Sequence, residues 1–217
     1  TTDNGTDVSR VGPGTANIEG TLTVEYGATL AVAVGSIDVN GTANIDGTVY
    51  IGYGFTKMSG MSGDLSSVAT ADMTAALNIN SNTTLSETSE IYQVAGTKVV
   101  VAQDVTLTLE GQFKDAVSIY NSGIVVIDSV PTNDAGDIIY SEKKVTVYMM
   151  ADGASVEVQN MATTMGGITI DDSKLPYTDA SRNNVTIGNV KNTTLDFNCN
   201  GEKSVISGLV VTEDFSY

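Results

Sequence analysis

One segment of this chain nearly repeats itself. Residues 14–27 (GTANIEGTLTVEYG) return 27 residues later as residues 41–54 (GTANIDGTVYIGYG), with nine of 14 positions identical. In both copies apolar residues alternate with polar ones, and Gly interrupts the alternation every six to eight residues. Short alternating runs separated by Gly predict half-buried β-strands. The segment 14–54 is therefore expected to be a repetitive β segment.

Three arrangements fit this segment. In a β-solenoid each 27-residue copy is one coil stacked on the next, whereas in a meander each Gly-x pair closes a hairpin. The solenoid is favoured because apolar residues keep even numbers from 16 to 34 and odd numbers from 37 to 51, straight through the glycines. Two copies are fewer than the about three that a repeat core needs, so a twisted sheet in a β-sandwich stays open.

The rest of the chain continues in short strands at roughly ten-residue spacing, which is typical of a sandwich, barrel or β-helix. The expected strands are 91–94, 98–102, 105–109, 117–120, 123–128, 137–140, 144–150, 155–158, 167–170, 184–187, 194–197 and 205–212.

The predicted fold class is all-β, with at most one short helix. The helix candidate is 64–77, where Asp64 could cap the first turn, and residues 78–89 are predicted to be an exposed polar connection. The expected division is a polar N-terminal arm (1–13), the repetitive segment (14–54), a loop with the helix (55–89) and a β-rich remainder of the same domain (90–217).

Composition excludes several classes of function. The formal net charge is −16 with only ten Lys and Arg, which argues against nucleic acid and anionic lipid as partners. The chain has no run of 18 apolar residues, so no segment is expected to span a bilayer. With 41% apolar residues, 6% aromatic residues and no Trp, the core has to be aliphatic.

Several features predict a secreted glycoprotein. The start TTDNGTDVSR looks like a mature end left by signal-peptide removal, although a truncated chain would begin in the same way. Five N-x-S/T sequons are glycosylation candidates: Asn4, Asn40, Asn82, Asn184 and Asn192. The single Cys199 is either a small buried residue or a thiol for an inter-subunit disulfide, and burial is favoured.

The chain offers little catalytic chemistry. It has no His, so Ser-His and Cys-His nucleophile pairs and His-ligated metals are excluded. The carboxylates of Glu19, Glu25, Asp38 and Asp46 alternate with apolar residues and are assigned to the solvated face. The scattered Tyr and Met residues suggest packing and not a cofactor site. No catalytic residue and no organic cofactor are predicted.

Calcium is the one metal considered. Acidic loops could supply hard oxygen ligands, and the weak candidates are Asp134, Asp137, Asp171 and Asp172. The pair at 171 and 172 is not expected to act together in catalysis, because neighbouring strand residues face opposite ways.

The stretches GTANIEGTLTV and GTANIDGTVYI, with the sequons and the short strands, resemble extracellular structural proteins of archaea, of the surface-layer (S-layer) and methanogen tubular sheath type. This resemblance implies a glycosylated, self-assembling, non-enzymatic protein whose sheets run from subunit to subunit. A weaker similarity is to bactofilins, which are polymers of six-residue β-helix arcs.

The function expected from the sequence is therefore a non-enzymatic, secreted structural subunit. Its partners are copies of itself, joined by β-sheet pairing into a cell-surface sheath, filament or S-layer. The alternative is a surface-displayed adhesin or carbohydrate-binding β domain. A β-helix polysaccharide lyase or hydrolase has the lowest weight.

Overall fold

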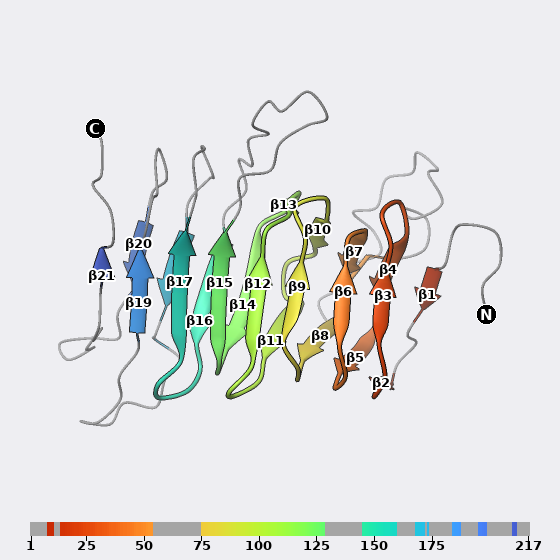
Figure 1. Ribbon diagram of the computed structural model, residues 1–217, viewed down its shortest axis with the longest axis horizontal. Coiled ribbons are helices and arrows are strands. Elements are labelled where there is room, and N and C mark those ends of the chain that lie inside the picture. Colours follow the sequence, from red (N-terminus) through yellow and green to blue (C-terminus); the bar gives the residue numbers. More distant parts are fainter. Residues whose placement is uncertain are drawn as a thin grey trace.

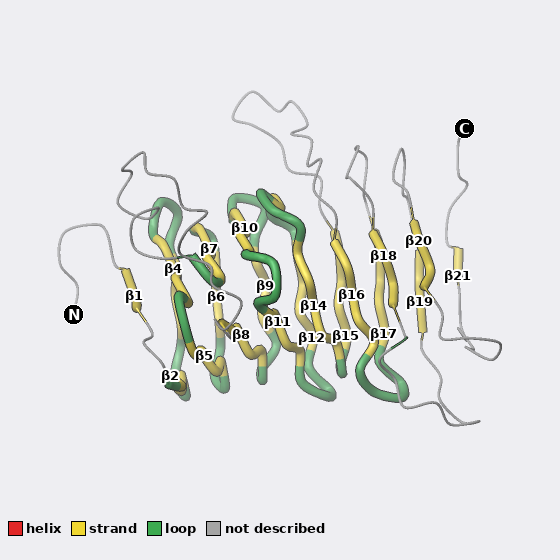
Figure 2. The backbone as a smooth tube through the Cα atoms, turned by 180° about the vertical axis from the view of Figure 1, so that it is seen from behind, coloured by secondary structure: helices red, strands yellow, loops and turns green. Residues whose placement is uncertain are grey.

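The computed structural model describes residues 8–10, 14–53, 75–128, 145–159, 168–171, 173, 184–187, 195–198 and 210–211. These residues form 21 β-strands joined by turns, and none of them is in a helix. The prediction of an all-β protein is confirmed. The strands belong to three sheets, which are drawn in Figure 1 and seen from behind in Figure 2.

Sheet A contains β1 (Val8–Arg10), β4 (Thr29–Val32), β7 (Thr48–Ile51), β10 (Glu90–Gln93) and β13 (Gln112–Phe113). Sheet B contains β2 (Thr15–Ile18), β5 (Gly35–Val39), β8 (Ala75–Ile79), β11 (Lys98–Val101), β14 (Val117–Asn121), β16 (Val145–Met149), β18 (Ile168–Asp171) and β20 (Leu195–Asn198). Sheet C contains β3 (Leu22–Val24), β6 (Ala43–Ile45), β9 (Thr83–Leu85), β12 (Thr106–Leu109), β15 (Ile124–Asp128), β17 (Ser155–Gln159), β19 (Asn184–Ile187) and β21 (Val210–Val211).

Every pairing between described strands is parallel. Consecutive strands lie in sheets A, B and C in turn, and the chain then begins the next level; we call each level a tier. Tiers 1 to 5 have a strand in all three sheets, whereas the described strands of tiers 6 to 8 lie only in sheets B and C. Tier 1 (β1–β3) and tier 8 (β20 and β21) therefore lie at opposite ends of the stack (Figure 1). The hairpins of the meander alternative are absent from these pairings.

Alternation within each strand places one set of side chains inside the stack. In sheet B, a column of aliphatic residues runs from tier to tier and is almost fully buried: Ile37, Leu77, Val99, Ile119, Val147 and Ile170. Phe113 is the one aromatic residue among the buried apolar side chains described. The core is aliphatic, as the composition predicts. The switch from even to odd inward positions occurs around Gly35, whose φ of +83° favours Gly.

The 27-residue repeat is not one tier, and this prediction is wrong. Stacked residues in this region are 19 or 21 positions apart, for example Leu30 with Val49 and Ile18 with Val39. The repeat instead relates Ile18 in sheet B to Ile45 in sheet C. It thus corresponds to one tier of 21 residues plus one strand-and-corner unit of six. The shorter six-residue spacing is the structural period within a tier.

The predictions for residues 64–89 need correction. Residues 75–77, the end of the expected helix, belong to β8, and the earlier part of that helix lies outside the described residues. The expected exposed connection at 78–89 contains the end of β8 and all of β9, and Ile79, Leu85 and Ser89 are buried in it. Most residues of this segment are Asn, Ser or Thr, and even the inward Thr83 is polar, so the alternation of apolar and polar residues is not visible in the sequence. Elsewhere the expected strands match β10 to β12 and β14 to β20, while β13 was not predicted and 137–140 lies outside the described residues.

Candidate functional site

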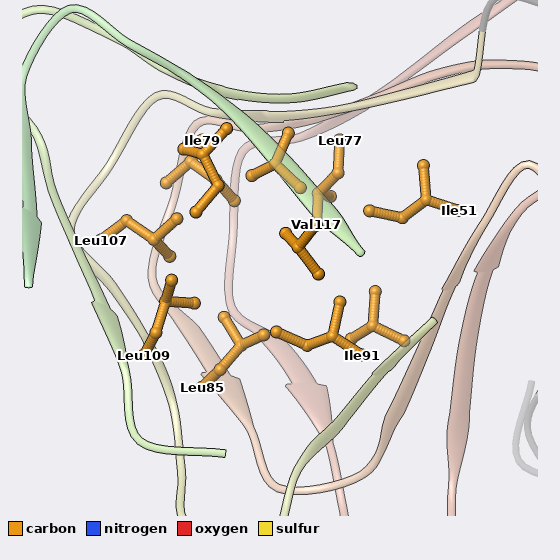
Figure 3. A pocket seen from close by; sticks show the side chains of 11 residues that line it. Ile51, Leu77, Ile79, Leu85, Ile91, Leu107, Leu109 and Val117 are labelled. Carbon is orange, nitrogen blue, oxygen red and sulfur yellow. The ribbon is translucent and has the colours of Figure 1, made fainter. Parts of the chain in front are cut away.

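The described part of the interior contains one small apolar cavity. The cavity, of about 10 Å³, lies between the sheets in tiers 3 to 5 (Figure 3), and its lining side chains are all aliphatic, including Ile79, Leu107 and Ile119. A space of this size holds one water molecule at most, and a water needs polar partners. The cavity is therefore a packing defect of the core. Among the described residues, no group of three or more Cys, Asp or Glu side chains could hold a metal ion.

The outer face of sheet A carries a cluster of tyrosines. Tyr50 and Tyr92 are paired in register on β7 and β10 and stack with ring centroids 4.6 Å apart and an interplanar angle of 22°. Tyr53 meets both rings edge-on, at 5.6 Å from Tyr50 and 6.3 Å from Tyr92. Parallel pairing in register places like residues side by side, so this face is a half-buried aromatic surface.

Two carboxylates at the border of the tyrosine cluster, Asp115 and Glu90, accept hydrogen bonds from its hydroxyl groups. The hydroxyl of Tyr53 donates to Asp115 Oδ2, which also accepts the backbone N–H of Gln93 at 3.0 Å. Glu90 Oε1 pairs with Lys114 Nζ at 2.9 Å, and Glu90 Oε2 accepts from Tyr92 at 3.3 Å. Asp115 and Lys114, just after β13, thus connect this segment with β10, and Asp115 also connects it with Tyr53 after β7. The bond between Tyr92 and Glu90 lies within β10.

Burial and the neighbouring negative charges raise the pKa values of the three tyrosine hydroxyls. Burial, then the charge of Glu90, raises the pKa of Tyr92 to about 12. Burial and the hydrogen bond to Asp115 raise the pKa of Tyr53 further above its ordinary value, and burial raises the pKa of Tyr50. All three side chains are therefore neutral at physiological pH.

Sheet B carries a second aromatic pair. Tyr120 and Tyr148 are in register on β14 and β16 and stack at 4.9 Å, with Lys98 Nζ 5.1 Å from the centre of the Tyr120 ring. These five tyrosines are scattered along the sequence, but the fold gathers them into two groups of packed rings. Residues 50 and 92 are far apart in sequence, so only the strand register shows that they adjoin.

Amide and carboxylate side chains form a further column at the corner between sheets B and C. Asn80 Nδ2 donates to Asn40 Oδ1 at 2.8 Å, and Asn40 Nδ2 donates to Glu19 Oε1 at 2.9 Å. Beside this column, Asn78 Nδ2 donates to Asp38 Oδ1 at 2.6 Å. These bonds tie three tiers together along the outside.

The structure describes some of the predicted site residues. The Asn40 nitrogen that would carry a glycan is used in the bond to Glu19, whereas Asn82 is exposed and its Oδ1 accepts the Thr106 N–H at 2.9 Å. Asn184 lies at the start of β19, and Asp171, at the end of β18, is buried and accepts the Ser173 N–H at 2.8 Å. The candidates outside the described residues are Asn4, Asn192, Asp134, Asp137, Asp172 and Cys199.

The expected solvent-facing carboxylates are placed as predicted. Glu19 and Glu25 are exposed, and Asp38 and Asp46 are half-buried on the outside. Three carboxylates whose proximity was not predicted lie at the corners after sheet C, where burial and the charges of Asp128 and Glu87 raise the pKa of Glu110. Three strands that pair in register, β9, β12 and β15, bring these carboxylates into adjacent tiers.

The stack is open at tier 1 among the described strands, as it also is at tier 8, where β20 and β21 are the last strands of sheets B and C. Strands β2 and β3 each have a partner on one side only among the described strands. Their inward residues Ala16, Ile18 and Leu22 are half-buried, whereas the stacked residues Ile37, Val39 and Ala43 in tier 2 are at most 3% exposed. Tier 1 thus presents two open strand edges above partly exposed core side chains.

Neither a scan of protein-family models nor searches of curated proteins and of solved structures found a match to this chain. Among the residues described above, there is also no helix of the length and apolarity needed to cross a membrane.

Proposed function

We propose that this chain is a secreted, non-catalytic β-solenoid subunit that assembles with copies of itself into a filament, sheath or surface layer. The solenoid is favoured over a sandwich because every described pairing is parallel and consecutive strands rotate through three sheets. Sandwiches are built from antiparallel sheets. Each tier is then one coil, and coils contact only their neighbours.

The open end of tier 1 is the observation that carries the proposal. Strand edges with unpaired backbone groups are templates for pairing with another chain, and monomeric proteins blunt them with Pro, bulges or charge. Strands β2 and β3 contain no Pro and no charged residue, and half-buried Ile18 and Leu22 lie along them. Pairing there would complete the ladders and bury this apolar surface.

Electrostatics opposes assembly and defines its salt dependence. A subunit with a net charge of −16 repels its copies, and this repulsion is screened beyond about 8 Å at physiological ionic strength. Added salt should therefore promote assembly, and divalent cations should promote it further where carboxylates of two subunits meet.

The test is negative-stain microscopy and sedimentation of the full chain across protein and salt concentrations. We expect ordered polymers whose yield rises with salt. Dispersed monomers at high protein concentration and physiological ionic strength would refute self-assembly. Polymers that dissolve as salt is added would show that attraction between charges, and not β-pairing, joins the subunits.

The tyrosine cluster on sheet A supports a second candidate function, the binding of carbohydrate at the cell surface. Aromatic faces beside polar groups are suited to sugar rings, and Tyr50 and Tyr92 lie beside Glu90 and Lys114. A glycan array with the folded chain tests this candidate. Absence of binding to every glycan class would remove it.

A further inference from the structure

Four corner glycines without a left-handed φ, Gly41, Gly47, Gly111 and Gly123, are explained by the tier that precedes them. A Cβ on Gly41 would lie 1.9 Å from the Gly20 carbonyl oxygen, and a Cβ on Gly47 would lie 2.4 Å from the Ala28 oxygen. Gly111 and Gly123 show the same close approach to carbonyl oxygens of the tier before them. No side chain fits at these corners, because a carbon cannot approach an oxygen so closely.

Gly20 departs from this explanation, as does Gly14, which precedes β2 in the same tier. Gly20 occupies in tier 1 the same corner as Gly41 in tier 2, yet a Cβ on Gly20 would have nothing within 4 Å, and its φ is not in the left-handed region. Gly at such a position lowers stability relative to Ala because it enlarges the entropy of the unfolded chain. The isolated subunit gives no steric reason for Gly20. A further coil stacked against tier 1 would give one.

Hydrogen bonds at the corners have a direction along the stack. After the strands of sheet B, the backbone N–H of the later tier donates to the carbonyl oxygen of the earlier one, as Asn40 and Gly41 donate to Ile18 and Asn80 donates to Val39. The corners after sheets A and C follow the same rule, for example Gly52 to Val32 and Asp46 to Val24. One described bond runs the other way, from the Leu22 N–H of tier 1 to the Thr42 oxygen of tier 2 at 2.8 Å. The N–H groups of Glu19, Gly20 and Glu25 in tier 1 have no such acceptor among the described residues.

We propose that tier 1 docks head to tail on tier 8 of a second copy, so that Gly20 packs against the neighbour's backbone. This inference rests on the proposed self-assembly and names its interface. The donor-rich corners of tier 1 match a tier whose strand-end carbonyl groups face outward, whereas two tier 1 ends facing each other would oppose donor to donor. Sheets B and C continue through the junction because both reach tiers 1 and 8, whereas the described strands of sheet A end at tier 5.

Such a contact joins two different surfaces, and because it continues the stack of tiers along its own axis, it produces an open filament and not a closed ring. Strand β2 would extend sheet B beyond β20, in the column that runs through Asp38, Asn78, Val100, Tyr120, Tyr148, Asp171 and Asn198. Asn17 begins this column at the other end of the subunit. Asn198 of one copy would therefore adjoin Asn17 of the next.

Disulfide cross-linking tests this geometry directly. In a Cys199→Ser background, Asn17→Cys combined with Asn198→Cys should form a ladder of covalent oligomers on oxidation, because paired strands bring Cα atoms within disulfide range. The Asn17→Cys chain alone should stay uncross-linked. Dimers from Asn17→Cys alone would show that two tier 1 ends meet, and polymers without the covalent ladder would show a different interface. Both results overturn the proposal.

A substitution at Gly20 supplies the independent test. Gly20→Val should leave the monomer folded and raise the critical concentration for assembly about tenfold or more, which corresponds to about 1.4 kcal/mol. Thr84→Val, an exposed position on the central strand β9, is the matched control and should assemble normally. Unchanged assembly of Gly20→Val overturns the interface while self-assembly stands. A wild-type chain that stays monomeric overturns both the interface and self-assembly.

Discussion

Replacing Gly by Ala at the same corner of two adjacent tiers, at Gly41 and at Gly20, should change the free energy of unfolding of the monomer in opposite directions. In Gly41→Ala, the new Cβ would lie 1.9 Å from the Gly20 oxygen, and tier 2 has to withdraw by more than 1 Å to reach 3.0 Å. The bonds from Asn40 N and Gly41 N to the Ile18 oxygen, both 2.9 Å, then lengthen to about 4 Å and are lost.

The magnitude follows from these bonds. Each backbone hydrogen bond contributes about 0.5–1.5 kcal/mol, and the displaced corner also strains the bond from Asn40 to Glu19. Gly41→Ala should therefore lower the free energy of unfolding by about 2–4 kcal/mol. Gly20→Ala meets no atom within 4 Å and should raise it by about 0.4–1 kcal/mol.

Urea unfolding of dilute, monomeric protein measures both values. An unchanged m-value shows that the substitution has not altered the surface exposed between the folded and unfolded states. Opposite signs are expected. If Gly41→Ala is neutral, the tiers are not in contact at this corner, and the steric explanation of the corner glycines is wrong. If Gly20→Ala is as destabilising as Gly41→Ala, the folded monomer already holds a coil against tier 1.

Three further predictions concern the core and the outer face. Ile79→Ala removes three carbons from a fully buried side chain beside the cavity and should cost about 3–5 kcal/mol, measured by thermal or urea unfolding; a loss under about 1 kcal/mol would contradict the described core. Asn121→Ala leaves the buried Gly123 N–H and Ser155 oxygen without their partner and should cost about 2–4 kcal/mol, whereas exposed Asn17→Ala should be nearly neutral. The raised pKa of Tyr92 stabilises the fold below pH 10, and this contribution is lost as pH rises toward about 12. Unfolding at a series of alkaline pH values should therefore show less loss in Tyr92→Phe than in the wild type, and equal losses would place Tyr92 in solvent.

The strands could be predicted from the sequence because alternation is a local property. Positions such as Ile37, Val39 and Ile45 show inward-facing residues directly, and the aliphatic core follows from a chain with few aromatic residues. Strand β9 was missed because its inward Thr83 is polar and the corners around it are rich in Asn and Ser. Asn121 was also missed, since a buried Asn in a core column has no sequence pattern that separates it from a turn residue.

The stacking of tiers could not be predicted because corners differ in length. Partners are 19 residues apart between β4 and β7 but 42 apart between β7 and β10, so no fixed period aligns them. The 27-residue repeat even indicated the wrong alignment, because it combines one tier with one extra strand unit. For the same reason the Tyr50–Tyr92 stack and the open end of tier 1 became visible only with the strand register in hand.

The unequal separation of stacked partners also makes this protein a scaffold for carrying foreign sequence. Leu30 and Val49 are 19 positions apart, whereas Ile37 and Leu77 are 40 apart, because the chain inserts an extra stretch between β7 and β8. The sheets on both sides nevertheless keep their parallel register. Each doubling of a loop costs only about 0.6 kcal/mol of closure entropy, so a peptide or small domain grafted at this corner would be carried by every subunit of a polymer and displayed at the regular spacing of its repeat.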